Sequence, residues 1–93
     1  MIQDLRCEET EKIWKGKTSR RLPGDIQRTA LRKLTQLSAA AVLDDLRVPP
    51  GNRLEALKAR REGQHSIRIN DQWRICFVWK DGHAHAVEIV DYH

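Results

Sequence analysis

The fold is decided by the stretch from Gln64 to Tyr92, which reads QHSIRINDQWRICFVWKDGHAHAVEIVDY. Three runs rich in β-branched and aromatic residues are separated there by Asn70-Asp71 and by Asp81-Gly82. An Asp-Gly pair suits the positive φ values of a tight hairpin turn. The stretch therefore predicts a three-stranded antiparallel meander, with strands at residues 64–69, 73–79 and 84–92.

Side chains alternate between the two faces of a strand, so the orientation of the middle strand is also readable. One face carries apolar side chains that would meet the core: Trp73, Ile75, Phe77 and Trp79. Arg74 points out of the opposite face, together with Cys76 and Val78. We therefore expect Arg74 on an open face of the sheet, where an acidic group could reach it.

Helical patterns precede the meander. Residues 8–14 begin with acids and are followed by Lys15 and Gly16, the order that a helix dipole and a left-handed cap prefer. A second helix is expected to open at Pro23 and Asp25, because apolar residues then recur at helical spacing. Those residues are Ile26, Ala30, Leu34 and Leu37. Ser38 is expected to cap a third, short helix over residues 39–43.

Two shorter segments complete the predicted sheet. Residues 2–6 alternate weakly, which suggests an edge strand, and residues 53–59 follow a turn at 49–52 and lead into the meander. The sequence thus predicts a single domain over residues 1–93. Its expected class is α+β, with two or three helices packed on one face of a mainly antiparallel sheet.

The charge of the chain is uneven. It carries 17 Lys and Arg against 13 Asp and Glu, a formal net charge of +4. Eight basic residues and one acid, Asp25, lie between Lys12 and Lys33. A local field of this sign favours a polyanion such as nucleic acid, and solvated surface charge is an equally good interpretation.

The location predicted from the sequence is cytoplasmic. No run approaches the roughly twenty apolar residues that span a membrane, and the first six residues lack the pattern of a secretory signal. Cys7 and Cys76 are too few and too far apart for a disulfide framework, so we expect both to be reduced.

The open face of the sheet is expected to collect residues suited to RNA cleavage: Lys58, Arg68, Arg74, Asp91, Tyr92 and His93. The neighbouring 2′-hydroxyl is the nucleophile in that reaction, so the protein supplies a base, an acid and cations, without a metal or cofactor. Each residue also has a structural interpretation, since a strand arginine usually pairs with an acid and terminal residues usually fray. His83 and His85 lack a third ligand, so no metal site is expected.

Four segments of the second half carry a family resemblance: Leu57-Lys58, Arg61-Glu62-Gly63, residues 66–77 and Val90-Asp91-Tyr92-His93. Together they resemble the HigB toxins of the RelE superfamily. The resemblance implies a RelE-like microbial ribonuclease fold and a ribosome-dependent endonuclease that cleaves messenger RNA in the ribosomal A site. It also implies a cognate HigA-like helix-turn-helix antitoxin. The toxin would contact operator DNA only indirectly, through its complex with that antitoxin.

The resemblance further implies residue roles. The family's catalytic group falls on Lys58, Arg74, Asp91, Tyr92 and His93. We expect Arg74 to be free to hold two phosphate oxygens, with Asp91 and His93 handling protons and Tyr92 positioning the nucleotide. Two positions depart from the family pattern, because Ala59 stands where relatives often have glycine and His65 where they often have an aromatic residue.

A set of basic residues is expected to grip RNA phosphates: Lys12, Lys15, Lys17, Arg20, Arg21 and Arg68, with Arg28, Arg32 and Lys33 extending the first five. Two other functions stay open. One is a RelE-superfamily protein that inhibits a target such as DNA gyrase by binding, without RNA cleavage. The other is an RNA-binding module, which the scarcity of aromatics for base stacking disfavours. The terminal Asp-Tyr-His group favours cleavage.

Overall fold

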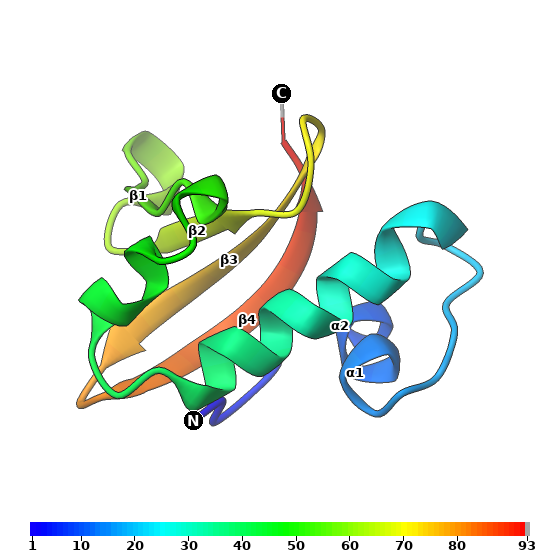
Figure 1. Cartoon of the computed structure of the whole chain (residues 1–93), viewed down its shortest axis with the longest axis horizontal. Helices are drawn as coiled ribbons and strands as arrows, with labels where there is room; N and C mark the ends of the chain where they lie inside the picture. Colours follow the sequence, from blue (N-terminus) through cyan, green and yellow to red (C-terminus); the bar gives the residue numbers. More distant parts are fainter. Residues whose placement is uncertain (93) are drawn as a thin grey trace.

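The computed structural model describes residues 1–92, and its sheet confirms the predicted meander. Strands β2 (His65–Arg68), β3 (Trp73–Lys80) and β4 (His83–Asp91) each pair antiparallel with the next. A two-residue strand, β1 (Glu55–Ala56), pairs antiparallel with β2, so the sheet order is β1-β2-β3-β4 (Figure 1).

The hairpin between β3 and β4 has the geometry that its sequence predicts. Asp81 and Gly82 have φ values of 54° and 79°, the positive values of a primed turn. Farther along, the register passes from Val78 opposite His85 to Cys76 opposite Glu88, so β4 holds one extra residue there. This β-bulge places Glu88 on the same face as Cys76, and side-chain alternation then carries that face to the end of β4.

Two helices, α1 (Glu8–Trp14) and α2 (Gly24–Ala39), pack on one side of the sheet (Figure 1). The predicted stripe of α2 is buried: Ile26, Ala30, Leu34 and Leu37. It meets the inner sheet residues Ile67, Ile75, Phe77 and Val87 in one cluster. Burying one such aliphatic side chain contributes about 1.5–3 kcal/mol, so this face of the sheet is firmly closed. The α+β class and the packing on one face are confirmed.

The predicted third helix over residues 39–43 is wrong. Helix α2 continues through Ser38 to Ala39, and the next element is a 3₁₀ helix, η1 (Leu43–Arg47). The carboxylate of Asp45 accepts the backbone N–H groups of Ala41 and Val42 at 2.9 and 3.1 Å. Asp45 satisfies these donors at the start of η1, whereas Ser38 lies inside a continuous helix and caps nothing.

The other short segments are less regular than expected. Residues 2–6 form only isolated bridges to β4, at Ile2 and Leu5, because the side chain of Asp4 takes the backbone N–H of Ala86. The predicted strand over residues 53–59 shrinks to β1, and short 3₁₀ turns flank it, η2 (Pro50–Asn52) and η3 (Ala59–Arg61). Within the described chain, neither α-helix has the length and apolar composition of a membrane span.

Lys33 is buried, which contradicts its expected place on the basic surface. Its ammonium donates to Oδ1 of Asn52, which is also buried. The amide of Asn52 donates to the carbonyl oxygen of Leu46 at 3.1 Å. Burial lowers the pKa of Lys33, with smaller effects from the charges of Arg32 and Arg68. This polar contact ties η2 to helix α2 and so anchors the chain immediately before β1.

Candidate active site

Arg74 is held on the face of the sheet opposite the helices. Its Nη2 donates to the carbonyl oxygen of Arg53 at 2.6 Å, and its Nη1 lies 3.9 Å from Oε1 of Glu55. Its guanidinium carbon lies 5.6 Å from the centre of the Tyr92 ring. Its Nε is buried and has no hydrogen-bond partner among residues 1–92. Arg53, Glu55 and Tyr92, which come from two separate parts of the chain, therefore surround this guanidinium.

Arg74 lies on the predicted face of β3, but its surroundings differ from the expectation of a free guanidinium on an open face. Its side chain is only 11% exposed, and the carboxylate of Glu55 approaches it from β1. Both differences arise because β1 pairs beside β2 and brings Glu55 and the carbonyl of Arg53 across the sheet. The guanidinium is consequently oriented by the protein rather than free.

Tyr92 completes this cluster. Its hydroxyl donates to Oε1 of Glu55 at 3.2 Å, and its backbone N–H donates to the carbonyl oxygen of Gln72 at 2.6 Å. The hydrogen bond to Glu55, and then the negative charge of that carboxylate, raise the pKa of Tyr92. Tyr92 is therefore a neutral hydrogen-bond donor near neutral pH.

Two other expected catalytic residues, Lys58 and Asp91, are close to this cluster along the chain. Lys58 stands exposed at the start of η3, three residues after Glu55, and its side chain has no hydrogen bond within the described chain. Asp91 alternates with Tyr92 along β4 and accepts from Nε2 of Gln72 at 3.1 Å. The prediction for His93 falls outside the described residues.

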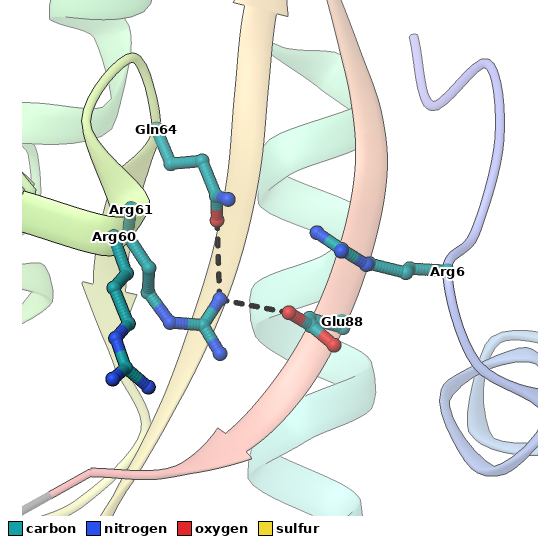
Figure 2. A pocket seen from close by; sticks show the side chains of 5 residues that line it. All are labelled: Arg6, Arg60, Arg61, Gln64 and Glu88. Carbon is teal, nitrogen blue, oxygen red and sulfur yellow. Dashed lines mark hydrogen bonds and ion pairs between the residues drawn. The ribbon is translucent and has the colours of Figure 1, made fainter.

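A second group of charged residues surrounds a hollow of about 500 Å³ lined by Arg6, Arg60, Arg61, Gln64 and Glu88 (Figure 2). Arg61 donates from Nη1 to Oε1 of Glu88 at 2.8 Å and to Oε1 of Gln64 at 3.2 Å. The bond to Glu88 raises the pKa of Arg61. Nearby on β3, burial raises the pKa of Cys76, which is a free thiol, as is Cys7.

A family model described as the RelE-like toxin of the type II toxin-antitoxin system HigB matches residues 2–93. The chain belongs to the HigB-like toxin family. Toxin HigB-1 of Vibrio cholerae serotype O1 is 47% identical over 68 residues, which cover 73% of this chain and 72% of that protein. An uncharacterized protein of Haemophilus influenzae is 35% identical over 66 residues, covering 71% of this chain and 65% of that one.

Among solved structures, the crystal structure of YafQ from Escherichia coli strain BL21(DE3) has a similar fold, with a TM-score of 0.55. The two chains are 10% identical, and the match covers 92% of this chain and 84% of that one. At this identity the likeness concerns the fold alone. The RelE-like fold expected from the sequence is thereby confirmed, and membership of a type II toxin-antitoxin family implies an antitoxin partner.

The basic residues of this HigB-like toxin divide between two sides. Lys12 in α1 pairs with Glu9 at 3.4 Å, and Lys15, just after α1, pairs with Glu11 at 2.8 Å. The loop that follows has three exposed cations. Those three are Lys17, Arg20 and Arg21. Arg68 instead lies on β2, opposite Arg74, and pairs with Asp71. The positive charge thus lies both on the helical side and on the sheet.

Glu55, which contacts both Arg74 and Tyr92, is a residue that the sequence did not predict. A signal was present, because residues 53–59 were expected to form a strand leading into β2. If that strand pairs antiparallel with β2 through the loop at Gly63, Glu55 lies opposite Ser66, which is the pairing in the structure. Ser66 is in turn opposite Cys76, so Glu55 belongs to the face of Arg74.

Proposed function

We propose that this HigB-like toxin is an endoribonuclease that cleaves messenger RNA in the ribosomal A site and thereby inhibits translation and growth. The observation that carries the proposal is the guanidinium of Arg74, which the carbonyl oxygen of Arg53 and the ring of Tyr92 orient on the sheet face opposite the helices. A guanidinium fixed in this way suits the non-bridging oxygens of a phosphodiester, which match its planar fork.

Glu55 is the movable part of the cluster. Its side chain is 45% exposed, against 11% for Arg74, and 3.9 Å is a long separation for an ion pair. An arriving phosphate would displace this carboxylate from Nη1 and take its place. The hydroxyl of Tyr92, released from Glu55, would then be available to the same phosphate or to the neighbouring ribose.

The chemistry that we propose proceeds through the 2′-hydroxyl of the RNA and is independent of a metal. Arg74 would stabilise negative charge that develops on the phosphate oxygens, and Lys58 would add a second positive charge from the start of η3. Asp91 and His93 would handle the protons of the 2′-hydroxyl and of the leaving 5′-oxygen, and Tyr92 would position the nucleotide.

The proposed setting follows from this activity. Residues 1–93 would act as one domain in the cytoplasm, on ribosomes carrying messenger RNA, and a HigA-like helix-turn-helix antitoxin would neutralise them. Lys12, Lys15, Lys17, Arg20 and Arg21 would contact ribosomal RNA phosphates, and Arg68 would contact the message beside Arg74.

The test replaces Arg74 by Ala and by Lys. Induced wild-type protein should arrest growth and fragment messages on programmed ribosomes, and both variants should lose cleavage by about a hundredfold or more, since lysine lacks the planar fork. Arg47→Ala is the matched control, because Arg47 is exposed on η1 and pairs only with Asp44 among the described residues. Toxicity that survived in the folded Arg74 variants, with inhibited DNA supercoiling, would instead favour binding to gyrase.

A further inference from the structure

The hollow around Glu88 carries more positive than negative charge. Arg6 and Arg60 are exposed, and their guanidinium groups have no ion pair or hydrogen bond within residues 1–92. Among those residues, Glu88 is the one carboxylate that lines the hollow, and its Oε1 is already held by Arg61. Three guanidinium groups therefore line the hollow with one carboxylate, which leaves an excess of positive charge there.

The side chains that build this hollow come from distant parts of the chain. Figure 2 shows Arg60 and Arg61 entering from the segment before β2, Arg6 from the N-terminal segment, and Glu88 from β4 between them. Arg6 is fixed at its backbone, where its N–H donates to the carbonyl oxygen of Val87 at 2.8 Å. Arg61 is fixed at its head by Glu88 and Gln64. The hollow is thus preorganised on two sides.

The hollow lies on the same face as the proposed active site. Glu88 is opposite Cys76 in the sheet, and Arg74 is two residues from Cys76 along β3. Glu88 of β4 and Tyr92, which follows β4, lie on this same face. Two residues of a strand span about 7 Å, so the hollow lies beside the Arg74 cluster on this face.

We propose that Arg6, Arg60 and Arg61 form a second phosphate subsite, which binds the internucleotide phosphate next to the one that is cleaved. The inference rests on the proposed function, because it takes the phosphate at Arg74 as the reference point. Arginine forks match phosphate oxygens, and contacts of this kind set the register of a strand without reading its bases. Glu88 serves to orient Arg61, so that its remaining donors face the hollow.

The experiment measures equilibrium binding of the toxin to ribosomes programmed with a short synthetic message that is 2′-O-methylated at the cleaved nucleotide. Methylphosphonate replaces, in turn, the linkage before and the linkage after the cleaved one, which removes a single charge each time. One of these two messages should bind wild-type toxin about tenfold more weakly, the loss expected for one charged contact. In the Arg6→Ala/Arg60→Ala variant, the same replacement should have no further effect.

Both substituted side chains are exposed and unpaired within the described chain, so this variant should fold normally. Lys80→Ala is the control, since Lys80 is an exposed cation at the far end of β3. It should keep the full effect of the methylphosphonate. A double variant whose binding still weakens tenfold, or a wild type indifferent to both replacements, would overturn the subsite.

Cleavage of the unmethylated message is measured separately. The double variant should need about tenfold more programmed ribosomes for half-maximal rate, with an unchanged rate at saturation, because the contact is equal in ground and transition states. A wild type that shows the phosphate effect in binding but cleaves no message would refute the proposed function and leave the subsite standing. A wild type that cleaves the message but shows no phosphate effect would refute the subsite and leave the proposed function standing.

Discussion

Arg74 differs from an ordinary strand arginine because separate groups hold it from several directions. The Arg53 carbonyl accepts from one end of the guanidinium, the Tyr92 ring lies against it, and Glu55 approaches the other end. Tyr92 and Arg74 both contact Glu55, so this one carboxylate links the two residues. Changes at Glu55 should therefore affect the pKa of Tyr92 as well as the position of the Arg74 guanidinium.

Glu55→Gln should lower the pKa of Tyr92. In the wild type, the hydrogen bond to Glu55 and the charge of Glu55 raise that pKa above the ordinary value of 10.0. Tyr92 is the single tyrosine of the chain, so ultraviolet absorbance of tyrosinate reports it alone. The wild type should titrate at a higher pH than Glu55→Gln, and Asp71→Asn, which removes an exposed carboxylate elsewhere, should titrate like the wild type.

The raised pKa of Tyr92 also determines how the stability of the fold changes with pH. A group whose pKa is raised by folding stabilises the folded state below its unfolded pKa, and this contribution disappears as pH rises through the folded value. The free energy of unfolding should therefore fall above about pH 10 by more in the wild type than in Glu55→Gln. Urea unfolding at several pH values measures this, and parallel curves for the two proteins would contradict it.

At the scale of elements, η2 connects helix α2 to the candidate active site. Asn52 in η2 accepts from buried Lys33 of α2, and the next residue is Arg53, whose carbonyl holds Arg74. Arg53 itself has a φ of 45°, a left-handed conformation that a neighbouring anchor must maintain. Packing of η2 on α2 is thus connected to the orientation of the guanidinium.

Asn52→Ala should destabilise the fold by about 3 kcal/mol, because it leaves the buried Lys33 ammonium without its acceptor and the Leu46 carbonyl without its donor. Urea unfolding measures the loss. Gln36→Ala is the control, since Gln36 contacts Asn52 at 3.3 Å but is only half-buried, and it should cost less than about 1 kcal/mol. Equal losses in the two variants would show that the contact with Lys33 has no special weight.

At the scale of the whole molecule, the two sides of the sheet have separate tasks in the proposed function. The sheet face opposite the helices holds Arg74, Tyr92 and the arginine hollow, whereas the loop after α1 presents Lys17, Arg20 and Arg21. A small enzyme that recognises a ribosome needs such a separate anchoring surface, which binds phosphates without reading sequence.

Reversal of Lys17, Arg20 and Arg21 to Glu should weaken ribosome binding and flatten its salt dependence. The slope of log affinity against log salt should fall by about one for each phosphate that the loop no longer binds. Titrations at several salt concentrations measure the slope. Lys80→Glu with Arg47→Glu is the control for a general change in net charge, and an equal slope change in that control would remove the loop from the interface.

Local patterns were sufficient for much of this fold. The Asp-Gly turn, the alternation along β3 and the apolar spacing of α2 depend on residues close in sequence, and the structure confirms all three. The prediction failed where local signals compete. Ser38 is a good cap in isolation, yet helix α2 continues past it, and the backbone N–H of Ala40 still donates to the carbonyl of Gln36. Asp45 instead satisfies the donors of the following turn.

The sequence by itself determined the meander, the two helices, the family and the face from which Arg74 projects, since each depends on periodicity or on a contiguous motif. Only the tertiary structure decided what surrounds that arginine. Glu55 and Arg53 come from β1 and the turn before it, and Tyr92 follows the end of β4. Hydrogen bonds between residues 21 to 37 positions apart leave no periodic trace in a sequence. Neither the burial of Arg74 nor the hollow around Glu88 could therefore be predicted from it.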